Sequence, residues 1–130
     1  MAAPPNFDLT GRWQVTHQVQ RSSVSRYVGM ELEFDVELNQ DGNAATGEGR
    51  KFVVDWELAP REEASTLSLR GAVEDGSVRL DVIERSPAHP GREMTGEIIW
   101  KVVAPDYLVG SFRMDAADSS GTSKARRRDS

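Results

Sequence analysis

Residues 28–42 read VGMELEFDVELNQDG, and this stretch decides the fold class. Apolar side chains occupy alternate positions, and every residue between them from Glu31 to Asn39 is polar. Successive residues of a strand face opposite sides, whereas a helix repeats its faces about every 3.6 residues. The alternation therefore predicts a strand with one buried face and one solvated face. Its apolar face carries Val28, Met30, Leu32, Phe34, Val36 and Leu38.

The stretch ends in Asp41-Gly42, which separates it from a second alternating run. Asp-Gly between two such runs is a strong signal for a two-residue hairpin turn. We therefore expect Leu38 to pair with Ala45, which makes the inward positions after the turn odd-numbered. The change of parity that follows predicts a bulge near Gly49-Arg50, where glycine permits one. Beyond it, the next apolar set is even-numbered: Phe52, Val54, Trp56 and Leu58.

The same period extends toward the N-terminus. Residues Gly11 to Gln20 form a predicted strand, and the polar residues of Arg21–Arg26 predict the loop that follows it. The inward face of this first strand carries Trp13, Val15, His17 and Val19.

The second half of the chain continues the pattern. A second Asp-Gly turn at Asp75-Gly76 pairs Val73 with Val78, and both arms of this hairpin agree on which face is apolar. Residues 86–92 predict a loop, and the alternating run from Met94 to Val102 predicts the next strand.

The last clear strand covers Tyr107–Asp115, and its inward face depends on the turn before it. We adopt a three-residue turn over a two-residue one, and we expect Thr122–Arg126 to add a final edge strand. The three-residue turn places Leu108, Gly110, Phe112 and Met114 inside, whereas the two-residue turn would place Tyr107, Val109, Ser111 and Arg113 there.

These patterns predict an all-β protein that forms a single antiparallel up-and-down barrel of about eight strands. A chain of 130 residues has room for one hydrophobic core. We expect residues 1–8 to form an N-terminal arm and residues 9–127 the barrel domain. Residues 128–130 are expected to be the end of a disordered basic tail.

Charge and composition argue against several classes of partner. The net charge is −5, and four of the sixteen basic residues lie in residues 124–130, so the barrel itself is more acidic than the whole chain. Such a charge repels nucleic acid. No apolar run approaches the ~20 residues that span a membrane, no secretory signal is seen, and cysteine is absent. We therefore expect a cytoplasmic monomer or homodimer with neither nucleic-acid nor membrane partners.

Residues Leu9–Trp13 read LTGRW, so the first strand opens with a Gly-x-Trp motif. In this motif the chain resembles the lipocalin and wider calycin group of small β-barrels, and it is similar to the avidin-like barrels as well. The resemblance implies that Trp13 closes one end of the barrel. It also implies that Trp13 packs against a basic residue of the last strand, Arg126 or Arg127.

His17 is the first candidate for a functional side chain. It lies on the inward face of its strand, and an imidazole titrates near neutral pH. Two interpretations stay open, a core histidine bonded to backbone or water, and an acid, base or ligand contact. His89 falls in the predicted 86–92 loop, so the two histidines form no metal-ligand motif, and we expect neither a metal nor a cofactor.

Large side chains and glycines share the predicted inward positions. Aromatic walls with gaps at glycines are typical of a ligand cavity. The glycines at inward positions are Gly47, Gly49, Gly71, Gly96 and Gly110. The predicted ligand-binding residues are His17, Tyr27, Phe34, Trp56, Trp100, Phe112 and Met114.

Three functions follow from this interior. In the first, the barrel binds a small, largely apolar molecule, and His17 or Tyr27 supplies one directional hydrogen bond. In the second, it is a cofactor-independent cyclase or isomerase that orients a reactive apolar substrate, with His17 as its catalytic candidate. In the third, the core is packed and an acidic strand face binds a protein. That face carries Glu31, Glu33, Asp35 and Glu37.

Overall fold

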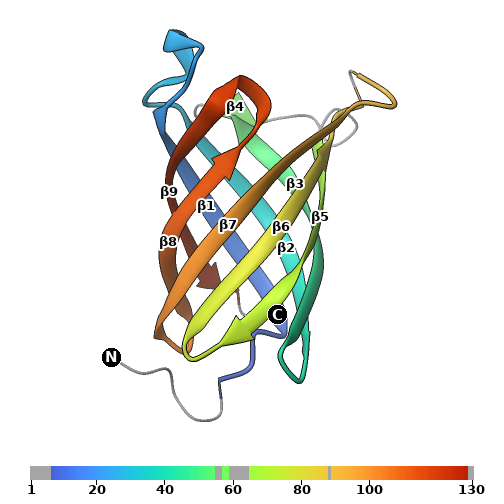
Figure 1. Ribbon diagram of the computed structural model, residues 1–130, viewed down its shortest axis with the longest axis vertical. Helices are drawn as coiled ribbons and strands as arrows, with labels where there is room; N and C mark the ends of the chain where they lie inside the picture. Colours follow the sequence, from blue (N-terminus) through green and yellow to red (C-terminus); the bar gives the residue numbers. More distant parts are fainter. Residues whose placement is uncertain (1–6, 55–56, 59–64, 88, 129–130) are drawn as a thin grey trace.

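The strands close on themselves into one antiparallel barrel (Figure 1). The computed structural model describes residues 7–54, 57–58, 65–87 and 89–128. In this part of the chain, eight long strands follow each other in up-and-down order, and β9 pairs with β1. The long strands are β1 (Gly11–Arg21), β2 (Glu31–Asp41), β3 (Ala44–Val54), β5 (Ser65–Glu74), β6 (Ser77–Arg85), β7 (Glu93–Ala104), β8 (Tyr107–Met114) and β9 (Ser119–Arg127).

Three short elements complete the fold. Strand β4 (Glu57–Leu58) pairs with β3, and the described residues also form two 3₁₀ helices, η1 (Ser25–Tyr27) and η2 (Ala116–Asp118). Within the described residues, no helix has the length and apolarity to cross a membrane. The predicted all-β antiparallel barrel of about eight strands is confirmed. Residues 59–63, where Pro60 predicts a further turn, lie outside the described residues.

The first hairpin turns one residue later than predicted. Gln40, rather than Leu38, pairs with Ala45, and the turn residues are Gly42 and Asn43. Of these two, only Gly42 has a positive φ, of 61°, and glycine at the first central position is typical of a type II′ turn. The pairing partner of Leu38 therefore moves by two residues, to Gly47, so the inward positions stay odd-numbered.

The predicted bulge in β3 exists, but it lies after Lys51 rather than near Gly49-Arg50. Phe34 pairs with Lys51 while its neighbour Glu33 pairs with Val53, so β3 carries one extra residue there. Residues directly opposite each other in a sheet share a face. Because Phe34 is buried in the core, Lys51 lies on the inward face of the barrel.

The hairpin at Asp75-Gly76 is confirmed, with Val73 opposite Val78 and positive φ at both turn residues. The adopted inward face of β8 is confirmed as well, since Leu108 and Phe112 are buried. The turn before β8 is nevertheless shorter than predicted. Ala104 pairs with Tyr107, and a register shift between Val102 and Ala104 supplies the missing residue.

One predicted strand limit is wrong, and so is the predicted position of the last strand in the sheet. Strand β2 begins at Glu31 rather than Val28, because Gly29 adopts a positive φ of 89° and the chain before it forms η1. Val28 is consequently half exposed. The last strand is not an edge strand, because β9 pairs with β8 on one side and β1 on the other.

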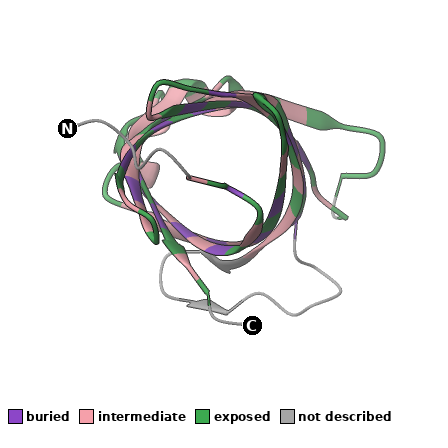
Figure 2. Ribbon diagram, turned by 90° about the horizontal axis from the view of Figure 1, so that it is seen from below, coloured by how far each residue is buried: buried purple, intermediate pink, exposed green. Residues whose placement is uncertain are grey.

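The barrel is closed at the end where β1 begins. Figure 2 looks into this end and shows the segment before β1 crossing the opening. Trp13 is fully buried there and donates a hydrogen bond from Nε1 to the carbonyl of Leu9, 2.8 Å away. The Arg127 guanidinium lies 4.4 Å from the centre of the Trp13 ring and donates hydrogen bonds to the carbonyls of Asp8 and Thr10. Arg127 is therefore the basic partner of Trp13.

Candidate functional site

The opposite end of the barrel is hollow. A cavity of about 440 Å³ opens there, near η1 and the ends of β1, β6 and β8. Apolar side chains make up most of its wall, among them Val19, Met30, Leu32, Met94, Phe112 and Met114. We call this space the mouth cavity.

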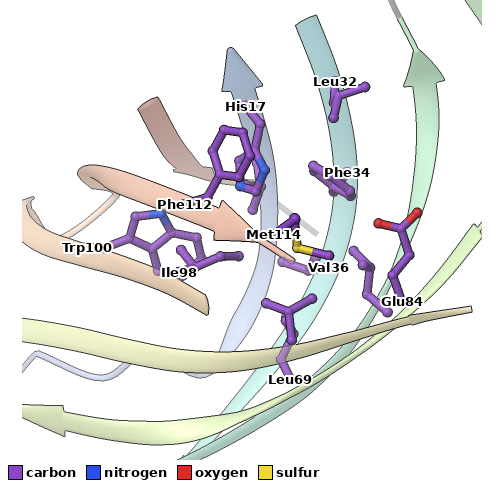
Figure 3. Close-up of a pocket in the computed structure, with 13 residues that line it drawn as sticks. His17, Leu32, Phe34, Val36, Leu69, Glu84, Ile98, Trp100, Phe112 and Met114 are labelled. Carbon is purple, nitrogen blue, oxygen red and sulfur yellow. The ribbon is translucent and has the colours of Figure 1, made fainter. Parts of the chain in front are cut away.

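A second, much smaller space lies deeper in the barrel (Figure 3). Its volume is about 30 Å³, which is roughly the space that one water occupies in the liquid. Leu32, Glu84, Phe112 and Met114 line both spaces, so the small one adjoins the floor of the mouth cavity. Beyond it, Trp13, Trp100 and their neighbours fill the interior. The barrel is thus packed at its closed end and hollow at its mouth.

His17 forms part of the floor between the two halves. Its ring stacks on Phe112 with 4.1 Å between ring centres and meets Phe34 edge-on at 4.7 Å. Only 3% of the residue is exposed, and its Nε2 has no hydrogen-bond partner among the described residues. Burial, assisted by the positive charge of Lys51, lowers the pKa of His17 to about 3. The imidazole is therefore neutral at physiological pH.

One ion pair lies on the inner face of the barrel. Lys51 Nζ is 2.6 Å from Glu84 Oε2, and the two side chains are 19% and 7% exposed. They come from β3 and β6, so the pair spans the inner face of the intervening strand β5. Both residues line the mouth cavity. Burial at this level is unusual for two charged groups and requires that they be paired.

Sequence reasoning missed both members of this pair. Lys51 escaped because the bulge was placed two residues too early, which assigned the lysine to the outer face. Glu84 could have been found, since it follows Leu80 and Val82 at the same spacing and the register of that hairpin was already known. A charged side chain is not expected on an apolar face, and for this reason the alternation alone does not mark Glu84 as inward.

Most of the predicted ligand-binding residues gather around the two spaces. Five of them, His17, Phe34, Trp100, Phe112 and Met114, line the inner space, and Phe112 and Met114 reach the mouth cavity too. Tyr27, at the end of η1, lines the mouth cavity. Trp56 lies outside the described residues. The indole of Trp100 already donates to Ser123 Oγ at 2.8 Å, so it contributes apolar wall rather than a free donor.

The inward glycines do not create the cavity, contrary to the prediction. A Cβ added to Gly71 would lie 1.7 Å from the carbonyl oxygen of Arg79, and one added to Gly96 would lie 2.3 Å from Met114 Sδ. Neighbouring strands and side chains already occupy these positions. Glycine is needed there so that the strands can approach closely, which helps a small barrel to curve. The mouth cavity exists because the packed side chains of the core end at the level of His17 and leave the space above it unfilled.

The acidic row on β2 faces outward, as predicted. Asp35 forms an ion pair with Arg12 at 3.1 Å, and Glu33 accepts a hydrogen bond from Gln14. Both partners lie on the outer face of the neighbouring strand β1, so the acidic row takes no part in the mouth cavity.

Comparisons with protein-family models, with curated proteins and with solved structures found no match to this chain.

Proposed function

We propose that the protein binds a small, largely apolar molecule in the mouth cavity. The observation that carries the proposal is the division of the interior, which is packed at the Trp13 end and hollow at the other. A volume of about 440 Å³ lies within the usual range of small-molecule sites, roughly 300–1,000 Å³. The wall is mostly apolar with a few polar groups, which is the usual composition of such sites.

The contact between Trp13 and Arg127 supports the resemblance to the lipocalin and calycin group, because that resemblance implies such a contact at a closed barrel end. A barrel closed at one end and open at the other is a cup. The ligand would enter through the mouth, where the cavity opens.

A neutral fluorescent probe tests the proposal. We expect N-phenyl-1-naphthylamine to brighten and shift to the blue when it is titrated with the protein, because it enters an apolar space. Replacing both Leu32 and Met94 by tryptophan fills the mouth cavity and should weaken probe binding at least about tenfold. The matched control is Ile99→Trp, which adds the same side chain to the exposed outer face of β7.

Two outcomes contradict the proposal. One is a parent protein that leaves the emission of the probe unchanged. The other is a folded Leu32→Trp, Met94→Trp variant, checked by circular dichroism, that binds the probe as tightly as the Ile99→Trp control.

The cyclase or isomerase alternative has less support. An acid or base works best when its pKa is near the working pH, whereas the pKa of His17 is about 3. The buried imidazole is thus poorly suited to transfer protons at neutral pH. An enzyme in this barrel would have to act by orienting its substrate. Passive binding needs the cavity alone and no catalytic group. The mouth cavity likewise weighs against the packed-core alternative.

A further inference from the structure

Two charged side chains in the wall of the mouth cavity are buried as a pair, and the hydroxyl-bearing Tyr27 and Ser119 line it as well. Lys51 and Glu84 lie together in its wall, and the unpartnered Nε2 of His17 lies in the adjoining space. His89 and Arg92 also border the cavity, but both are exposed to solvent at its rim. Exposed charges are screened by water and salt, so the rim groups act on a ligand more weakly than the inner pair.

The inner pair has hydrogen-bonding capacity left over. A lysine ammonium has three N–H donors, and Lys51 uses one of them on Glu84 in the described part of the structure. A polar atom that enters the cavity beside the pair can therefore accept a hydrogen bond from Lys51. The carboxylate of Glu84 can accept one in return from a hydroxyl group.

The charges of the pair decide what kind of head group fits. Lys51 and Glu84 neutralise each other at 2.6 Å. A carboxylate on the ligand would gain attraction from Lys51 and meet repulsion from Glu84, and an ammonium would meet the reverse. Either ion would also lose its hydration in an apolar cavity without gaining an unpaired counter-ion. An uncharged oxygen loses less hydration and still finds a donor.

We propose that the Lys51–Glu84 pair selects ligands whose apolar body carries one uncharged oxygen head group, an alcohol, a phenol or a ketone. The selection acts against carboxylates and ammonium ions of the same size. This inference deepens the proposed binding function and rests on it. The His17 imidazole, which lines the adjoining inner space, offers a further polar atom to a head group that reaches the floor of the cavity.

A matched set of naphthalene compounds tests the selection. The probes are 2-naphthol, methyl 2-naphthyl ketone, naphthalene-2-carboxylate, 2-naphthylmethylammonium and unsubstituted naphthalene, each measured at pH 7 by displacement of N-phenyl-1-naphthylamine. We expect the naphthol and the ketone to bind the parent protein at least about tenfold more tightly than either ion. They should also bind more tightly than naphthalene itself.

Two single variants should redirect the preference. Glu84→Gln leaves the charge of Lys51 unbalanced, so the carboxylate should become the best of the five probes. Lys51→Met leaves Glu84 without its partner, so the ammonium should gain affinity relative to the carboxylate. The matched control is Glu97→Gln, which breaks a similar ion pair with Arg79 on the outside of the barrel and should leave the order unchanged.

The double variant Lys51→Met, Glu84→Met guards against misfolding caused by one unpaired buried charge, and it removes both hydrogen-bonding partners of the head group. It should fold, by circular dichroism, and bind naphthol no better than naphthalene. Equal binding of all five probes to the parent overturns the selection and leaves the proposed function standing. An unchanged order in folded Glu84→Gln overturns it as well. Failure of every probe to bind the parent contradicts the proposed function itself.

Discussion

The buried imidazole of His17 makes the stability of the barrel depend on pH in a defined window. In the folded protein its pKa falls from 6.5 to about 3, because burial and the nearby charge of Lys51 disfavour the protonated ring. The unfolded chain keeps the ordinary value of 6.5. Between these two values the unfolded chain takes up a proton that the folded protein refuses. Stability is therefore complete above pH 6.5 and is lost progressively as the pH falls toward 3.

The size of the loss follows from the shift. Each pKa unit corresponds to about 1.4 kcal/mol, so the whole window corresponds to about 5 kcal/mol. At pH 5 the loss amounts to about 2 kcal/mol, a large part of the stability of an ordinary domain. Asp8 and Asp115 also have lowered pKa values, the first held by hydrogen bonds from Thr10 and the second by those from Thr95 and Arg113. These carboxyl groups affect the stability only as the pH falls to about their ordinary pKa of 3.8, so they change it little above pH 5.

Urea unfolding, followed by tryptophan emission at pH 7.5 and pH 5, measures the loss. We expect the parent to lose about 2 kcal/mol between the two conditions and His17→Phe to lose almost none, because phenylalanine keeps an aromatic ring without a titrating group. The variant also removes the unpartnered Nε2, whose burial costs roughly 1–3 kcal/mol, so it should be at least as stable as the parent at pH 5. The control His89→Gln changes an exposed histidine and should behave as the parent does. If the parent and His17→Phe lose the same free energy, the imidazole is not the source of the pH dependence.

The closed end and the strand curvature give two more expectations. Trp13→Ala should lower the free energy of unfolding by about 3–5 kcal/mol. Trp13→Phe should lower it by about 1 kcal/mol, because the hydrogen bond to the Leu9 carbonyl is lost. If Trp13→Ala unfolds in urea as the parent does, Trp13 does not hold this end closed. Gly71→Ala would bring a Cβ within 1.7 Å of the Arg79 carbonyl, so β5 and β6 must separate at a cost of about 1–3 kcal/mol. An unchanged thermal melting temperature for Gly71→Ala would mean that the two strands relax freely.

Strand period alone was sufficient to predict the barrel and much of its interior. His17 was placed correctly, because it alternates in step with Trp13 and Val15 and no bulge interrupts that part of β1. The hairpin at Asp75-Gly76 was placed correctly because two independent arms had to agree on one apolar face. At Asp41-Gly42 the second arm carries only Ala45, Gly47 and Gly49 at its inward positions, so its apolar face is weakly marked and the turn was off by one residue.

The polar centre of the site was harder to predict, and the reason is physical. A bulge shifts every later side chain to the other face. The segment before Lys51 has no large apolar residue, because it reads Gly47, Glu48, Gly49 and Arg50, so its pattern does not fix where the bulge lies. The folded protein chooses a position that puts a charged side chain inside, which a rule based on hydrophobic alternation rejects. The buried lysine is stable there because Glu84 on β6, thirty-three positions along the chain, forms an ion pair with it.

The pairing of β9 with β1 has a consequence for the nascent chain. On the ribosome the first strand emerges first, and the strand that must cover one of its edges emerges last. Until residues 119–127 are released, β1 and β8 both present open edges, which are templates for pairing with other chains. A chain truncated before β9 should therefore accumulate as aggregates rather than as a weakened monomer.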